Sequence, residues 1–377
     1  MPRPAAVLLT FDPALNQLDP QDSGKELRQG LSMVLEIGPT LWVANDETLA
    51  LERLTRQPGP TRTYADHTRF ALHELLRLPV PPEDDQAPEA DIEGLDYADG
   101  YLWLVGSHSL KRRKAEVDKS VVKNQKRLAD ISADGNRYLL ARVPVVLDAA
   151  GLPTLVAVAG EGREQRHAAR LRGNAKGDEL TRALADDPHL GPFLAIAGKD
   201  NGFDVEGLAV MPGGHLLLGL RGPVLRGWAV VLEVAPTPDP ADPTLLRLQP
   251  IGPDGARFRK HFVQLRGLGI RDLLLEGADL LLLAGPTMDL DAPVTVFRWR
   301  GGAAPQAESV VFADDQQLTP VLDVPTGRLG RTGTDRAEGI CRLTDDPTRL
   351  LVVYDAADPA RFQGSSSVTA DLFRLDQ

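Results

Sequence analysis

Short apolar runs separated by turns recur along this chain, and one pattern appears five times. It consists of a polar lead residue, a strand-like run, a turn and a second strand-like run. The five copies are QGLSMVLEIGPTLWVAND (29–46), EGLDYADGYLWLVGSH (93–108), EGLAVMPGGHLLLGLRGP (206–223), RDLLLEGADLLLLAGP (271–286) and EGICRLTDDPTRLLVVYDA (338–356). Successive lead residues are 64, 113, 65 and 67 positions apart. Such self-similarity indicates a repeat architecture.

Each repeat continues with a third strand-like run, and several continue with a fourth. The third runs are ALERL, RYLLARV, WAVVLEV, VTVFRW and ADLFRL, and the fourth runs include FALHELLRL, HFVQL and SVVF. The N-terminal AAVLLTF (5–11) has the length of a strand but no repeat of its own. Repeated four-stranded units closed by a terminal strand describe a β-propeller, which leaves no open sheet edge.

We therefore expect an all-β protein, a single propeller domain over residues 1–377 with five four-stranded blades. Residues 5–11 should pair with the C-terminal strand near 369–375. Six blades are an alternative, because the 113-residue interval has room for a degenerate one. A two-domain α/β fold is disfavoured, since strands follow strands without helical crossovers.

Residues 110–200 are expected to form a basic and partly helical insertion between the second and third blades. LKRRKAEVDKSVVKNQKRL (110–128) is strongly basic, and GNAKGDELTRALADDPHLGPF (173–193) predicts a short helix that ends at a turn rich in proline and glycine.

Composition narrows the classes of function. The net charge of −11 argues against a general nucleic-acid binder, because such proteins need a basic face to neutralise phosphates. The single cysteine, Cys341, excludes an internal disulfide and a cysteine-rich zinc site. The N-terminal apolar run is too short for a signal peptide, and no run approaches the roughly 20 apolar residues that span a bilayer. A cytoplasmic protein without membrane contact is the expectation.

Blade topology places the lead residues around one mouth of the central channel. They are Gln29, Glu93, Glu206, Arg271 and Glu338, and the loops after the second strands add Asp46, His108, Arg221 and Asp355. Converging carboxylates need a nearby positive charge, or the pKa of at least one rises. Ca²⁺ held by the three glutamates could supply that charge. The guanidinium of Arg271 could also supply it, and a third alternative is that the glutamates cap the channel by bonding backbone amides.

Four segments resemble an uncharacterised bacterial family, domain of unknown function 3616. They are NGFDVEGLAV, GLRGPVLRGWAVVLEV, GIRDL and DIEGLDYADGYLWLVGSHSLKRRK, and the resemblance extends over most of the chain. It implies that Arg221 and Arg271 belong to the family pattern, but it implies no activity.

A looser similarity links the chain to calcium-dependent apyrases, which are five-bladed propellers with a calcium ion in the channel. Glu93, Glu206 and Glu338 match the glutamates that lead the blades in those enzymes. Gln29 and Arg271 depart from that pattern.

The site is expected to bind a small anionic molecule that carries phosphate or carboxylate, and hydrolysis of this molecule is a further option. The residues with assigned roles fall into three groups: Arg221, Arg271, Lys111 and Arg112 to bind the anion, with Gln29, Asp46 and Asp355 beside it; Glu93, Glu206 and Glu338 to position Arg271, a metal or a water; and His108 to transfer protons. The basic run that starts at Lys111 would steer the anion, unless it is only a solvated loop. No organic cofactor is expected. A non-catalytic platform for a protein partner is the alternative function.

Overall fold

The computed structural model describes residues 4–19, 22–82, 89–198, 202–288, 293–313, 316–325 and 335–375. Strands that follow one another in sequence pair antiparallel in repeated units. The units are β4 (Leu31–Ile37), β5 (Thr40–Asn45), β6 (Ala50–Gln57) and β7 (Thr63–Ala71); β8 (Ile92–Ala98), β9 (Tyr101–Gly106), β12 (Leu140–Leu147) and β16 (Ala169–Leu171); β19 (Asp204–Val210), β20 (Leu216–Gly222), β21 (Ala229–Val234) and β24 (Phe258–Val263); β25 (Gly269–Glu276), β26 (Asp279–Gly285), β27 (Val294–Trp299) and β29 (Leu318–Val324); and β30 (Arg336–Leu343), β31 (Asp346–Asp355), β33 (Ser367–Arg374) and β1 (Ala5–Thr10).

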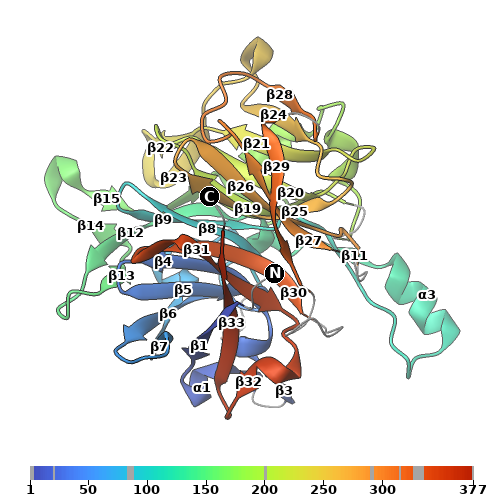
Figure 1. Ribbon diagram of the computed structural model, residues 1–377. Coiled ribbons are helices and arrows are strands. Elements are labelled where there is room, and N and C mark those ends of the chain that lie inside the picture. The colour runs from blue at the N-terminus through green and yellow to red at the C-terminus, as the bar shows by residue number, and fades with distance from the viewer. Residues whose placement is uncertain are drawn as a thin grey trace.

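The first strands of these units surround a common axis. β4 contacts β8, β8 contacts β19, β19 contacts β25, β25 contacts β30, and β30 contacts β4, so the circle of contacts is closed. Figure 1 shows the units arranged around this centre. The prediction of an all-β, propeller-like fold is confirmed.

The two ends of the chain close the structure together, as predicted. β1 pairs antiparallel with β33, with Ala5 opposite Leu372 and Thr10 opposite Ser367. Figure 1 shows the blue β1 beside the red β33. β1 also pairs in parallel with β7, where Leu8 lies opposite Thr63. One sheet therefore runs from the last unit into the first.

Outer edges are covered by segments that come from the following unit. β23 (Asp242–Leu248), in a hairpin with β22 (Pro236–Asp239), pairs in parallel with β16 of the unit before it. β28 (Ser309–Val311) pairs in parallel with β24 in the same way. Exposed edges template aggregation, so this exchange protects the rim of the molecule.

Two segments that were predicted to be fourth strands do not form the fourth strand of their own unit. SVVF forms β28, which joins the preceding unit, and the fourth strand of its own unit is β29. FALHELLRL lies mostly beyond β7 and contains the helix α2 (Leu72–Leu75). The error has a physical reason: outer strands such as β7 are half-exposed and carry polar residues, so they lack the apolar run by which strands were sought.

The remaining elements are short. They are α1 (Pro13–Asn16), α3 (Val121–Ala129), α4 (Glu179–Leu184), β2 (Gln17–Asp19), β3 (Asp22–Glu26), β10 (Lys111–Arg112), β11 (Ile131–Ser132), β13 (Pro153–Leu155), β14 (Val158–Ala159), β15 (Arg166–His167), β17 (Gly173–Asn174), β18 (Gly177–Asp178) and β32 (Phe362–Gln363). Helices were predicted in both segments that contain α3 and α4, and both are confirmed. None of the helices in the described ranges has the length and apolar character needed to cross a bilayer.

Glycines allow the first strands to approach one another closely at the axis. A Cβ atom on Gly94 would lie 2.9 Å from the amide nitrogen of Leu208, and one on Gly207 would lie 2.9 Å from the backbone of Asp272. A Cβ on Gly339 would lie 3.0 Å from the Cα of Met33. The glycine of each repeated Glu-Gly pair is therefore explained by packing against the next strand around the axis.

We predict that Gly207→Ala destabilises the protein by about 1–3 kcal/mol more than Gly213→Ala, because only the first forces overpacking. Both glycines have positive φ, 99° and 95°, but a Cβ on Gly213 meets nothing within 4 Å. Chemical denaturation of both variants measures the difference. Equal losses would show that backbone conformation, and not the close approach of β19 and β25, explains the cost.

Candidate functional site

Each first strand is irregular at the same place, and the irregularity displaces one side chain from the regular pairing. The displaced residues are Ser32, Glu93, Glu206, Arg271 and Glu338. All five are buried. A bulge of this kind changes the direction of a side chain, so charged residues leave the sheet face here.

Ser32 occupies the position in β4 that was assigned to Gln29. Gln29 lies three residues earlier, in a 3₁₀ turn formed by Leu27–Gln29, and its Oε1 accepts from the amide of Glu26 at 3.2 Å. The offset has a simple cause: Gln-Gly-Leu resembles Glu-Gly-Leu, but the bulge falls between Leu31 and Met33.

Arg271 joins two of the three repeated glutamates. Its Nη1 donates to Oε2 of Glu206 at 3.4 Å and to Oε1 of Glu338. Its Nη2 donates to the carbonyl oxygen of Pro286 at 2.6 Å, and the side chain is 4% exposed. The guanidinium therefore lies between Glu206 and Glu338, as the hypothesis of a built-in arginine cation expects.

A second arginine, Arg221, shares Glu206. Its Nη1 donates to Oε1 of Glu206 at 2.8 Å, and its Nε donates to the carbonyl oxygen of Thr287 at 3.2 Å. Within the described ranges Nη2 of Arg221 has no hydrogen-bond partner, and the side chain is 12% exposed. Glu206 therefore has a guanidinium at each oxygen, while Arg221 keeps a donor that no described residue uses.

Glu338 has an acceptor that the described residues leave unused. Its Oε2 is buried without a hydrogen-bond partner among them. Burial raises the pKa of Glu338 to about 6; Arg271 opposes the rise, and the charges of Glu206 and Asp355 add to it. This carboxyl group is therefore harder to ionise than an exposed glutamate.

Asp46 and Asp355 lie together where the first and last units meet. A Cβ on Gly30 would be 3.1 Å from Oδ1 of Asp355 and 3.6 Å from Oδ1 of Asp46. Asp355 is also near enough to Glu338 to influence its pKa. Glu93 is buried in the bulge of β8. Arg271 bonds the other two repeated glutamates, Glu206 and Glu338.

His108 is not the rim base that was expected. Its Nδ1 lies 2.8 Å from the carbonyl oxygen of Gly106, and its Nε2 lies 2.9 Å from Oδ2 of Asp178. Burial opposes its charge, but the charge and hydrogen bond of Asp178 outweigh burial and raise the pKa of His108. Because both nitrogens face acceptors, both donate, and the imidazolium joins β9 to the start of α4. No sequence signal marked Asp178 as its partner.

Lys111 and Arg112 belong to residues 110–132, the arm that carries α3, and their partners lie in or beside this arm. Lys111 pairs with Glu89 and Asp134, and Arg112 donates to the carbonyl oxygen of Leu128 at 2.6 Å. These contacts stabilise the arm, and the structure does not bring either residue to Arg271.

Sequence reasoning missed the side chains that tie neighbouring first strands together. Asp96 accepts from the amide of Val210 at 2.6 Å, and Asp272 accepts from the amide of Ile340 at 2.8 Å. Ser32 donates to the carbonyl oxygen of Ile92 at 2.9 Å. Burial raises the pKa of Asp96 to about 6, although two backbone amides oppose it. These residues lie at different positions within their repeats, so aligning the repeats could not reveal them.

The buried residues Glu93, Glu206, Arg271 and Glu338, here called the charged ring, do not fit a calcium ion. Ca²⁺ takes six to eight oxygen ligands. In the part of the chain that the structure describes, no group of three or more Asp, Glu, His or Cys side chains is arranged to hold a metal. The guanidinium of Arg271 stands between Glu206 and Glu338, where calcium would need oxygen atoms.

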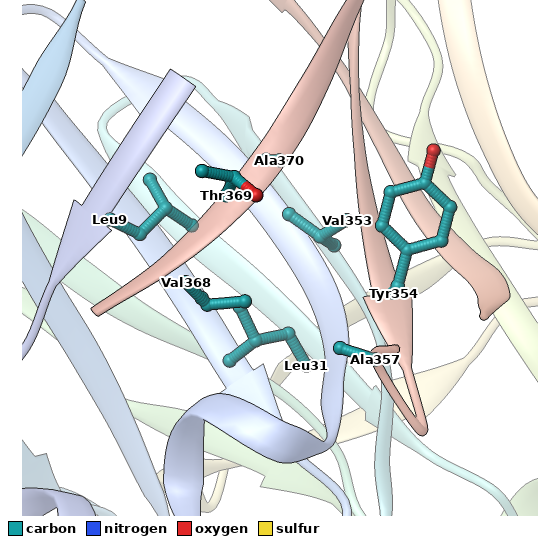
Figure 2. A pocket seen from close by; sticks show the side chains of 8 residues that line it. All are labelled: Leu9, Leu31, Val353, Tyr354, Ala357, Val368, Thr369 and Ala370. Atoms are coloured by element: carbon teal, nitrogen blue, oxygen red, sulfur yellow. The ribbon is translucent and has the colours of Figure 1, made fainter. Parts of the chain in front are cut away.

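A small pocket lies in the core between β1, β4, β31 and β33. Figure 2 shows its lining, which consists of Leu9, Leu31, Val353, Tyr354, Ala357, Val368, Thr369 and Ala370. The hydroxyl of Tyr354 already donates to Asp371, and that of Thr369 donates to the carbonyl oxygen of Arg361. It offers no charged group to a ligand, and we assign it no role.

Comparisons with known proteins place the chain in a family. The model of DUF3616, described as a protein of unknown function, matches residues 30–371. The comparison with curated proteins found no match. The similarity to calcium-dependent apyrases is not shown.

Solved structures resemble the chain at low identity. A streptogramin B lyase has 8% identity and a TM-score of 0.34, with 98% of each chain covered. The PQQ-bound aldose sugar dehydrogenase of Streptomyces coelicolor has 14% identity and a TM-score of 0.35, with 99% of each chain covered. Because both TM-scores are below 0.5, we base no argument on them.

We predict that Arg271→Met destabilises the protein by about 3–5 kcal/mol at pH 7.5, because buried carboxylates lose their cation. The pKa of Glu338 should then rise above its value near 6, so the folded state takes up a proton that the unfolded state lacks. The loss relative to the parent protein should therefore shrink as the pH falls toward 5. Denaturation curves at several pH values measure this.

Arg349→Met is the matched control. Arg349 pairs with Asp346 at 2.9 Å in a half-exposed setting, and surface pairs contribute only about 0–1 kcal/mol. Equal losses of stability in the two variants would contradict the role given to Arg271. So would a loss for Arg271→Met that does not change with pH.

Proposed function

The chain belongs to the DUF3616 family, and on that premise we propose that it is a five-bladed propeller that binds a small, hydroxylated anion at one mouth of its channel. One observation carries the proposal. Arg221 has a free donor in Nη2 and Glu338 has a free acceptor in Oε2 within the described residues, and Arg271 and Glu206 connect them.

The proposal includes the number of blades and the extent of the domain. The closed circle of first strands supports five blades and a single domain over residues 1–377. In this interpretation residues 110–200 carry the third and fourth strands of the second blade as well as the basic and helical insertion.

The chemistry of the two groups defines the ligand class. A guanidinium donor suits a phosphate or carboxylate oxygen, and the fixed bonds at Nε and Nη1 of Arg221 preorganise it. A carboxylate acceptor suits a hydroxyl group. A sugar acid or sugar phosphate carries both features, and Asp355 lies near Glu338 to accept a further hydroxyl.

We further propose that the protein hydrolyses the bound molecule. Glu338 is suited to proton transfer, because burial places its pKa at about 6. Glu206 acts as a positioning residue, because both its oxygens are bonded to arginines. His108 and calcium have no part in this mechanism.

A protein-interaction platform is the second candidate function. It is favoured by the exposed apolar side chains around α3, which include Val117, Val121 and Val122. The two functions use different parts of the molecule, so one does not exclude the other.

We predict that sugar acids or sugar phosphates bind, whereas the matching neutral sugars do not, as measured by calorimetry. The ligand hydroxyl donates to the ionised Oε2 of Glu338, so binding favours the ionised form and releases the proton of Glu338. Affinity should therefore fall by up to about tenfold per pH unit as the pH falls below about 6. Glu338→Gln should remove this dependence.

Arg221→Met should weaken binding, with Arg226→Met as the control, because Arg226 is an exposed arginine in the loop that follows β20. Product release that Glu338→Gln abolishes would support hydrolysis. If neutral sugars bind equally well, or if Arg226→Met weakens binding as much as Arg221→Met does, anion recognition by Arg221 is wrong.

A further inference from the structure

Residues 110–132, here called the arm, project from the body of the molecule and fold on themselves. Figure 1 shows α3 outside the body, with β11 between α3 and the body. β10 pairs antiparallel with β11. None of the residues of α3 is buried. Ser120 caps the helix, Asn124 bonds both the amide and the carbonyl of Glu116, and Arg127 donates to the carbonyl oxygen of Lys114 at 2.7 Å.

The arm exposes large apolar side chains. Its outward-facing members are Val117, Val121, Val122, Leu128 and Ile131, with exposures from 44% to 107%. A nine-residue helix has little stability of its own in water, and such helices are normally stabilised by packing an apolar face. The arm therefore has the features of an element that is completed by a partner.

Charge indicates which partner fits. The arm contains eight basic and three acidic residues, a net charge of +5, so the total of −11 leaves −16 for the rest of the chain. The rest of the same chain therefore carries the charge that complements the arm. An anionic membrane fits less well, because the body would be repelled from it.

We propose that the arm docks on the body of a second copy of this chain. A two-fold arrangement lets each copy give one arm and receive one, which doubles the buried area. Basic side chains provide the attraction, and the apolar residues of α3 become buried on docking.

The test is sedimentation velocity of the whole chain over a range of protein concentrations, in low and high salt. We expect concentration-dependent dimers in low salt that weaken as salt rises. Lys123→Glu with Lys126→Glu should raise the dimer dissociation constant at least about tenfold, since contacts between close charges contribute strongly to affinity. In the described structure neither lysine side chain bonds another residue of the arm, so the arm itself should keep its fold.

Arg300→Glu with Arg374→Glu is the matched control, because it makes the same change in charge at exposed positions outside the arm. It should leave the dissociation constant within about twofold of the parent value. Val117→Ser with Val122→Ser should weaken the dimer without changing charge.

A chain that stays monomeric in low salt overturns the proposal. Binding to anionic phospholipid vesicles that depends on Lys123 and Lys126 would then assign the arm to a membrane surface. Dimers that survive both arm variants also overturn it, because the contact would lie elsewhere.

Discussion

The buried guanidinium of Arg271 is the interaction on which the centre of this propeller-like fold depends. It lies on β25 and bonds Glu206 on β19 and Glu338 on β30, so one side chain joins three consecutive first strands. Two buried carboxylates without a cation would raise one another's pKa and open the ring. Arg221 strengthens the same junction by bonding the other oxygen of Glu206.

The fold makes this junction necessary. First strands meet so closely at the axis that glycine is required where Gly94, Gly207 and Gly339 contact the next strand. The bulge beside each glycine turns the displaced side chain out of the regular sheet, and the displaced side chains are mostly charged. Around the rim, β23 and β28 cover the outer strands of the preceding unit, so the sheets are joined at both the centre and the edge.

The sequence predicted the repeat, the closure by β1 and the cation at Arg271, because each depends on a local pattern or on charge balance. It placed Gln29 at a ring position that belongs to Ser32, since a bulge moves the register without changing the apolar pattern. It placed His108 on the rim, whereas Asp178, 70 residues away, holds it in the core. Asp96 and Asp272 were missed because their partners are backbone amides of neighbouring strands, which a sequence pattern does not show.

The central claim is that Arg271 and Glu338 stabilise the ring through each other. A double-mutant cycle with Arg271→Met and Glu338→Gln, measured by denaturation at pH 7.5, isolates that coupling. We expect a coupling free energy of about 2–3 kcal/mol, with the double variant more stable than Arg271→Met alone, because neutral Gln no longer needs the cation. Additive losses in the two single variants would contradict the claim.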